Sequence, residues 1–130
     1  MSTYTSAVAE QITDLRAAFP DKKVIADPDG AGGAYVTVKP IDPGPTFIQS
    51  ESTLGFQITN LCPHADIYPV FLSPDLKRVD GRDHISPFTV VSWRNQPALQ
   101  FSTRTNPHDP QKDTAATKVA QVIEWLAIRE

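Results

Sequence analysis

Apolar residues of this chain recur at helical spacing near both ends and at every second position in between. The first helical stripe predicts an amphipathic helix from Ser6 to Phe19, which ends because Pro20 cannot supply a helical N–H. The second stripe predicts a C-terminal helix that Asp113 or Thr114 can cap. The stripes contain Val8, Ile12, Leu15 and Phe19 in the first helix and Ala115, Val119, Val122, Ile123 and Leu126 in the second. Each helix therefore has an apolar face that must be buried against another part of the chain.

The alternating segments between the helices predict antiparallel strands. Turn sequences rich in glycine and proline separate them, and residues 27–33 are expected to close a hairpin. The expected strands are Val24–Ala26, Ala34–Lys39, Phe56–Thr59, Phe88–Trp93 and Leu99–Phe101. At 130 residues the chain is expected to form one domain, residues 1–130. The predicted fold is α+β, with an N-terminal helix, a four- to five-stranded antiparallel meander sheet and a C-terminal helix packed on the sheet.

Charge and composition exclude several classes of partner. The net charge is −3 and the twelve basic residues are scattered, which argues against a nucleic-acid-binding face. No apolar stretch approaches the length that crosses a membrane, and the polar start of the sequence does not resemble a secretory signal. The single cysteine cannot form an internal disulfide, which fits a reducing compartment. We therefore expect a cytoplasmic protein with no nucleic-acid or membrane partner.

A proline-rich cluster follows the central predicted strand. The stretch from Gly55 to Pro74 reads GFQITNLCPHADIYPVFLSP and holds the only cysteine, Cys62, together with His64. Residues two apart on an extended strand share a face, so the His64 imidazole could approach and activate the Cys62 thiol. No second base or orienting carboxylate is fixed by the spacing. The commoner fate of such a cysteine is that of a small, partly buried hydrophobe at the end of a strand.

The order of helix, strands and proline-rich segment resembles the ubiquitin-conjugating-enzyme superfamily, which includes the conjugating enzymes, their inactive variants, the RWD domains and bacterial relatives. In that family an N-terminal helix leads into a four-strand meander whose third strand ends in a Tyr-Pro motif followed by further prolines. Tyr68-Pro69 matches the motif, and Pro74 matches the later proline. Gly44-Pro45 stands where the family often has a Gly-Pro before the third strand.

The catalytic features of that family are missing from this sequence. Conjugating enzymes carry a nucleophilic cysteine downstream of the motif, after a His-Pro-Asn triplet. No cysteine follows Cys62 here, and Asp83-His84 lacks the Pro-Asn; the proline spacing after Tyr68 is also one residue longer than in RWD domains. The resemblance therefore implies a non-catalytic protein-interaction module, and one setting that it allows is a bacterial ubiquitin-like pathway. The partner would then be a ubiquitin-like protein or an activating enzyme.

The residues around the Tyr-Pro motif are expected to have structural and binding roles. Fixed proline geometry and a packed tyrosine ring would clamp the end of the sheet. The apolar run after the motif is expected just outside regular structure, where exposed side chains favour a docking patch with Phe71 as its main contact. The predicted clamp consists of Tyr68, Pro69 and Pro74, and the predicted partner-binding patch consists of Val70, Phe71 and Leu72.

Two other functions stay open from the sequence. An atypical ubiquitin-like conjugating enzyme would use Cys62 as its thioester carrier. A secretion-type chaperone would be a small acidic dimer, also built from helices on an antiparallel sheet. We expect no metal, because the separations of His64, His84 and His108 match no short-range ligand pair. We also expect no cofactor, because the glycine-rich residues 27–33 lack the Gly-Lys-Ser/Thr ending of a phosphate loop.

Overall fold

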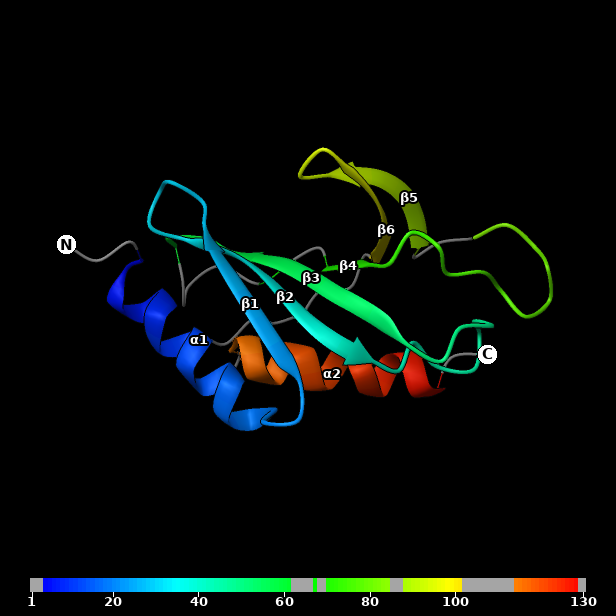
Figure 1. Ribbon diagram of the computed structural model, residues 1–130, viewed down its shortest axis with the longest axis horizontal. Helices are drawn as coiled ribbons and strands as arrows, with labels where there is room; N and C mark the ends of the chain where they lie inside the picture. The colour runs from blue at the N-terminus through cyan, green and yellow to red at the C-terminus, as the bar shows by residue number, and fades with distance from the viewer. Residues whose placement is uncertain (1–3, 62–66, 68–69, 85–87, 102–113, 129–130) are drawn as a thin grey trace.

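The structure, a computed structural model, describes residues 4–61, 67, 70–84, 88–101 and 114–128. Six strands form one antiparallel sheet in the order β1-β2-β3-β4-β6-β5, with one helix before and one after them in the chain. The elements are α1 (Ser6–Ala18), β1 (Lys23–Pro28), β2 (Ala34–Ile41), β3 (Ser52–Ile58), β4 (Val70–Leu72), β5 (Phe88–Trp93), β6 (Gln96–Phe101) and α2 (Ala115–Ile128). The predicted α+β arrangement with a helix at each end is thus confirmed (Figure 1).

The predicted count of four to five strands is wrong, because the sheet has six. The additional strand is β4, whose residues Val70–Leu72 were expected outside regular structure. Three residues are too few for a period of two to be recognised in the sequence. β4 forms because β3 and β6 lie on its two sides, so that Leu72 is paired with Leu54 and with Leu99. The hairpin of β5 and β6 therefore joins the meander through β6 and leaves β5 at an edge.

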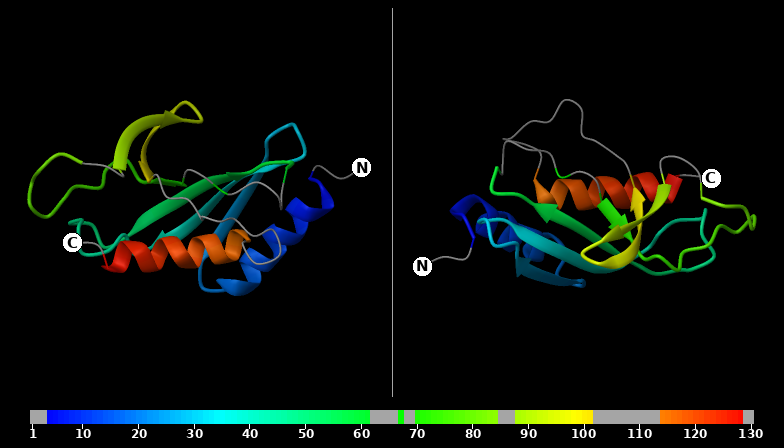
Figure 2. Two further views of the ribbon diagram at one scale, coloured as in Figure 1. Left: turned by 180° about the vertical axis from the view of Figure 1, so that it is seen from behind. Right: turned by 90° about the horizontal axis from the view of Figure 1, so that it is seen from above.

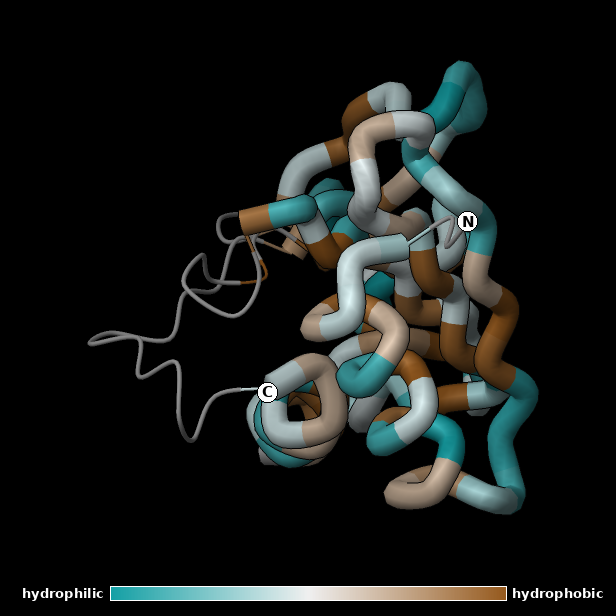
Figure 3. Tube along the Cα trace, turned by 90° about the vertical axis from the view of Figure 1, so that its left-hand side faces the viewer, coloured by the Kyte–Doolittle hydropathy of each residue, from teal (hydrophilic) through white to brown (hydrophobic). Residues whose placement is uncertain are grey.

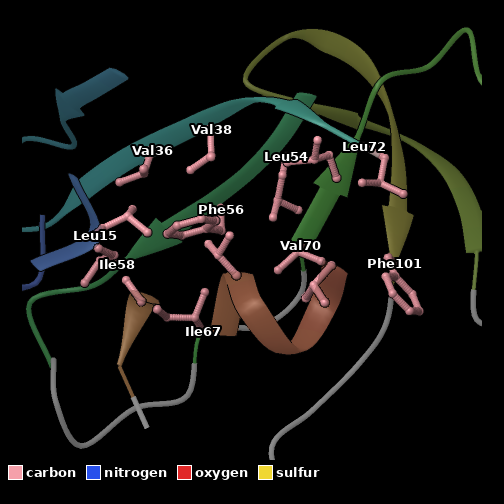
Figure 4. Packing of buried hydrophobic residues seen from close by; sticks show 14 of the residues in the cluster. Leu15, Val36, Val38, Leu54, Phe56, Ile58, Ile67, Val70, Leu72 and Phe101 are labelled. Atoms are coloured by element: carbon pink, nitrogen blue, oxygen red, sulfur yellow. The ribbon is translucent and has the colours of Figure 1, made fainter. Parts of the chain in front are cut away.

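Both helices pack against the same face of the sheet (Figures 1 and 2). The inward-facing residues of the central strands meet the apolar stripes of the helices in one buried cluster (Figure 4). The alternation that produces this face is visible as short brown and pale bands along the chain in Figure 3. Buried members of the cluster include Val8, Leu15, Val36, Leu54, Phe56, Leu99, Phe101 and Leu126.

Polar side chains fix the starts of the two helices. Thr5 Oγ1 accepts a hydrogen bond from the Val8 N–H at 3.2 Å and caps α1. Gln11 Oε1 of α1 accepts a hydrogen bond from the Ala115 N–H at 2.8 Å, in a buried position, and satisfies a donor at the start of α2.

Neither α1 nor α2, the two helices in the described part of the chain, has the length and apolar character of a membrane span.

Candidate functional site

The sheet has two edge strands, and side chains protect one of them, β1. Arg16 of α1 donates a hydrogen bond to the Val24 carbonyl at 3.3 Å, and Tyr4 donates one to the Ala26 carbonyl at 3.4 Å. Lys23 adds a charge at the start of the strand. An incoming strand would have to displace these groups, so the β1 edge is closed to strand pairing.

The other edge strand, β5, carries no charged residue. It pairs with β6 through a two-residue turn in which Arg94 and Asn95 have φ of 54° and 62°, the backbone of a type I′ hairpin. In such a hairpin the pair that closes the turn exchanges both hydrogen bonds, and the pairs then alternate. Val90 and Ser92 therefore direct their N–H and C=O groups away from β6. Pro97 lies opposite Ser92. This pair exchanges no hydrogen bonds in the register described, so the missing N–H of proline costs no bond between β5 and β6.

A row of paired residues explains why β5 exposes an aliphatic side chain. Val38, Leu54, Leu72 and Leu99 lie side by side across β2, β3, β4 and β6, and each is at most 2% exposed. Val90 is the next residue in this row, and it is 64% exposed. The hairpin of β5 and β6 bends away from both helices (Figures 1 and 2), which accounts for the exposure of Val90 at the end of this row.

A groove of about 620 Å³, which we call the β5 groove, runs beside this strand. Besides Val90, the groove is lined by a second exposed aliphatic side chain, Ile48, which is 65% exposed. Exposed aliphatic side chains that share one groove are typical of binding sites, whereas isolated ones are not informative. The groove is lined by Phe88, Thr89 and Val90 of β5, Ile48 from the β2–β3 connection, and Lys77, Arg78, Gly81, Arg82, Asp83 and His84 from the β4–β5 connection.

Backbone and side-chain hydrogen bonds hold the two connections that form the far wall of the groove. The Ile48 N–H donates to the Lys77 carbonyl at 2.8 Å, and the Val79 N–H donates to the Thr46 carbonyl at 2.9 Å. Gln49 Oε1 also accepts a hydrogen bond from the Lys77 N–H at 2.9 Å. The wall is therefore a short two-stranded ribbon around the Phe47–Arg78 bridge, and it fixes the position from which the Lys77 side chain leaves the backbone.

The charges around the groove are not balanced. Arg78 pairs with Asp80 in a two-pronged contact of 2.7 Å and 3.0 Å, and these hydrogen bonds hold the pKa of Asp80 well below its usual value. The Asp80 carboxylate therefore neutralises Arg78 at any ordinary pH. Lys77, Arg82 and Asp83 are left, two cations against one anion, so the lining is positively charged although the whole chain is acidic.

His84 packs between the wall and the core. Its Nε2 lies 2.9 Å from the Leu76 carbonyl oxygen, and since a carbonyl only accepts, Nε2 carries the proton. Its Nδ1 is buried with no hydrogen-bond partner among the described residues. The ring also contacts Phe47 at a centroid distance of 5.9 Å. The described residues contain no group of three His, Cys, Asp or Glu side chains that could hold a metal ion.

An aromatic cluster on the helix-free face of the sheet sets the position of the β5–β6 hairpin. Trp93 stacks on Phe71 with ring centroids 4.4 Å apart and meets the Tyr35 ring edge-on at 6.2 Å. The Arg94 guanidinium lies 4.5 Å from the Tyr35 ring centre and 3.6 Å from an Asp27 carboxylate oxygen. These contacts hold the hairpin against the outer face of the sheet.

The residues that the sequence singled out are distributed differently from the expectation. Val70 and Leu72 point into the core and are 0% and 2% exposed, whereas Phe71 faces outward beneath Trp93 and is half-buried. Pro74 is exposed just after β4, and its role as a clamp stays a prediction, as does partner contact at Phe71. Four of the predicted site residues lie outside the described part of the chain, namely Cys62, His64, Tyr68 and Pro69, and so do His108 and the alternative cap Asp113.

The β5 edge and its groove were not predicted from the sequence. The uncharged run from Phe88 to Trp93 was a usable signal for a strand, but nothing local marks it as an edge strand. Comparison of the chain with protein-family models, with curated proteins and with solved structures finds no match. The site is therefore interpreted from its own chemistry: outward backbone groups, two exposed aliphatic side chains and a surplus of positive charge.

Proposed function

We propose that this chain is a non-catalytic protein-interaction module that binds an extended segment of a partner protein along β5. The observation that carries the proposal is the outward orientation of the Val90 and Ser92 backbone groups on an uncharged edge beside an open groove. Strand addition gains affinity from backbone hydrogen bonds and specificity from the pockets that receive alternate side chains. The contrast with β1, whose carbonyls are already bonded by Arg16 and Tyr4, leaves β5 as the edge suited to this role.

The proposal includes a ubiquitin-conjugating-enzyme-like fold of the inactive or bacterial type. It is supported by the order of α1, the meander of β1 to β4 and a helix at the end, and by Gly44-Pro45 between β2 and β3. Tyr68-Pro69 follows the end of β3 by ten residues and stands directly before β4 in the sequence. The lack of any cysteine after Cys62 supports the non-catalytic assignment. The extended segment would then belong to a ubiquitin-like protein or an activating enzyme. This choice of partner is an analogy from the proposed fold.

A partner segment fits the β5 edge better than a second copy of the chain does. A twofold axis through Val90 would pair the two β5 strands with each other. It would also bring the two β5 grooves to the same interface, with Lys77 and Arg82 of both copies present. Like charges brought together at an interface are unfavourable, so we expect the free protein to be monomeric in light scattering. A dimer that dissociates when Val90 is replaced by proline would contradict the proposal.

The test uses the uncharged, dye-labelled heptapeptide Thr-Val-Thr-Gln-Thr-Val-Thr as a strand-forming probe, with binding followed by fluorescence anisotropy. Val90→Pro removes an outward N–H without removing a hydrogen bond between β5 and β6, since edge strands accept proline at such positions. Val90→Ile is the matched control, because it keeps both the donor and the branched side chain. We expect Val90→Pro to weaken binding about tenfold, or about 1.4 kcal/mol, near the upper end for one hydrogen bond.

Hydrogen exchange gives an independent readout of the same contact. The amides of Val90 and Ser92 should exchange more slowly when the peptide is bound, because each becomes a donor to the added strand. Urea unfolding and circular dichroism establish that both variants are folded. Equal affinity of the proline and isoleucine variants for the peptide would refute strand addition at β5.

A further inference from the structure

The β5 groove also specifies the chemistry of the segment that would bind there. Resting on the proposed function above, we infer that the segment carries one acidic and one apolar side chain two residues apart, both directed into the groove. The acidic side chain meets the Lys77 and Arg82 cations, and the apolar one covers Val90 and Ile48.

The spacing of two residues follows from the geometry of the sheet. Phe88 and Val90 are paired with the buried residues Phe101 and Leu99, so their side chains leave the sheet on the face that the helices cover elsewhere. Thr89, between them, points to the opposite face. An added strand alternates in the same way, and only every second side chain reaches the face of Phe88 and Val90.

The apolar requirement comes from the two exposed aliphatic side chains. Val90 and Ile48 are 64% and 65% exposed and line the same groove from opposite walls. A valine or leucine placed between them removes apolar surface from water on both sides at once. A polar residue at that place would gain nothing comparable, so the apolar position is expected to be selective.

The acidic requirement comes from cations that the protein itself leaves unbalanced. Lys77 and Arg82 are exposed, and neither forms an ion pair with another described residue. Asp80 accepts hydrogen bonds from Arg78 and from the Arg82 N–H, the latter at 3.0 Å, and the Arg82 guanidinium is a weaker charge partner of the same carboxylate. A carboxylate from the partner would meet complementary charge here, whereas a lysine would meet like charge.

Three peptides that differ at the central position test the inference: Thr-Val-Thr-Glu-Thr-Val-Thr, its glutamine form and its lysine form. An exposed ion pair typically raises affinity by a factor of about 1.4 to 5, so two pairs should make the glutamate peptide bind about fivefold more tightly than the glutamine peptide. The lysine peptide should bind more weakly than both. At about 1 M salt, where the screening length is about 3 Å, the differences should disappear.

Charge reversal in the protein assigns the preference to the groove. The double variant Lys77→Glu with Arg82→Glu should invert the order, so that the lysine peptide binds most tightly. The matched control is Lys23→Glu with Lys39→Glu, which changes the net charge equally at the opposite edge of the sheet, where Lys23 and Lys39 are paired. The control should keep the original order, because its charges lie far from β5.

The failure of this inference and the failure of strand addition give different results. Equal binding of the glutamate and glutamine peptides, or the same loss of preference in both double variants, would overturn the acidic segment while Val90→Pro still weakened binding. No measurable binding of any of the three peptides, or binding that Val90→Pro leaves unchanged, would overturn both. Inversion by the groove variant alone, together with weakening by Val90→Pro, is the result that we expect.

Discussion

Replacing Gly55 with alanine should destabilise this protein through Trp93 alone. Gly55 lies on the helix-free face of β3, and a Cβ placed on it would lie 2.5 Å and 2.8 Å from two carbon atoms of the Trp93 ring. Carbon atoms in contact normally stay about 3.5–4.0 Å apart, so the ring would have to move by about 1 Å. Trp93 cannot tilt freely, because it stacks flat on Phe71 at 4.4 Å and is bounded by Tyr35.

The expected magnitude is the difference between two opposing terms. Overpacking of this kind typically costs about 1–3 kcal/mol. Alanine in place of glycine within a strand raises the free energy of unfolding by about 0.5–1 kcal/mol, because the chain then loses less conformational freedom on folding. Gly55→Ala should therefore lower the free energy of unfolding by about 1 kcal/mol. In a Trp93→Ala background only the entropic gain from replacing glycine is left. There, Gly55→Ala should raise the free energy of unfolding by about 0.5 kcal/mol.

The assay is urea unfolding of the four proteins of this double-mutant cycle, with Gly55→Ala measured in both backgrounds. With a urea dependence of about 1.5 kcal/mol per molar, Gly55→Ala should lower the urea midpoint by about 0.7 M in the wild-type background and raise it by about 0.3 M in the Trp93→Ala background. The coupling energy should be about 1.5 kcal/mol, well above the usual error of such cycles. An equal loss of stability in both backgrounds would show that Trp93 does not lie over Gly55.

Two further substitutions test the loops that frame the sheet. Gly44 has a φ of +91°, and a Cβ there would collide with the carbonyl of Leu126 in α2. Gly44→Ala should therefore lower the free energy of unfolding by about 3 kcal/mol and the midpoint of thermal unfolding by about 10 °C. A change below about 2 °C would contradict this packing. The N–H groups of Ala31 and Gly33 donate to the Asp29 carboxylate at 2.7 Å and 3.0 Å and hold its pKa below its ordinary value of 3.8. Because the folded pKa is lowered, this contribution to stability is present above about pH 4 and is lost as the pH falls through the folded value. The stability advantage of the wild type over Asp29→Asn should therefore be constant near neutrality and shrink in acid, and an advantage that grew below pH 4 would refute the assignment.

Local spacing was sufficient to predict both helices and their buried faces. Val8, Ile12 and Leu15 repeat at helical intervals, and all three are buried in α1. The predicted end at Phe19 differs by one residue from the observed helix, because Phe19 is the residue that caps it. The hairpin of β5 and β6 was also predictable, since the polar break after Trp93 separates two segments that both favour strand.

The sequence could not predict β4 or the status of β5. Val70–Leu72 was interpreted as an exposed run because its three residues are too short to show alternation. Its middle residue, Phe71, was singled out for partner contact, but the structure shows that its outer side is occupied by Trp93, which is twenty-two positions further along the chain. No local pattern near either residue indicates this contact.

The amino-acid sequence by itself determines which positions of each helix and strand are apolar, because side-chain direction repeats with the period of the backbone. It does not determine that Leu72 is paired with Leu99 and that Val90 ends the row at an open edge. Backbone N–H and C=O groups are the same in every residue except proline, so they do not encode which segment becomes their partner. Only the packing of distant segments in the folded chain decides that β6 enters the sheet and that the hydrogen-bonding groups of β5 face outward.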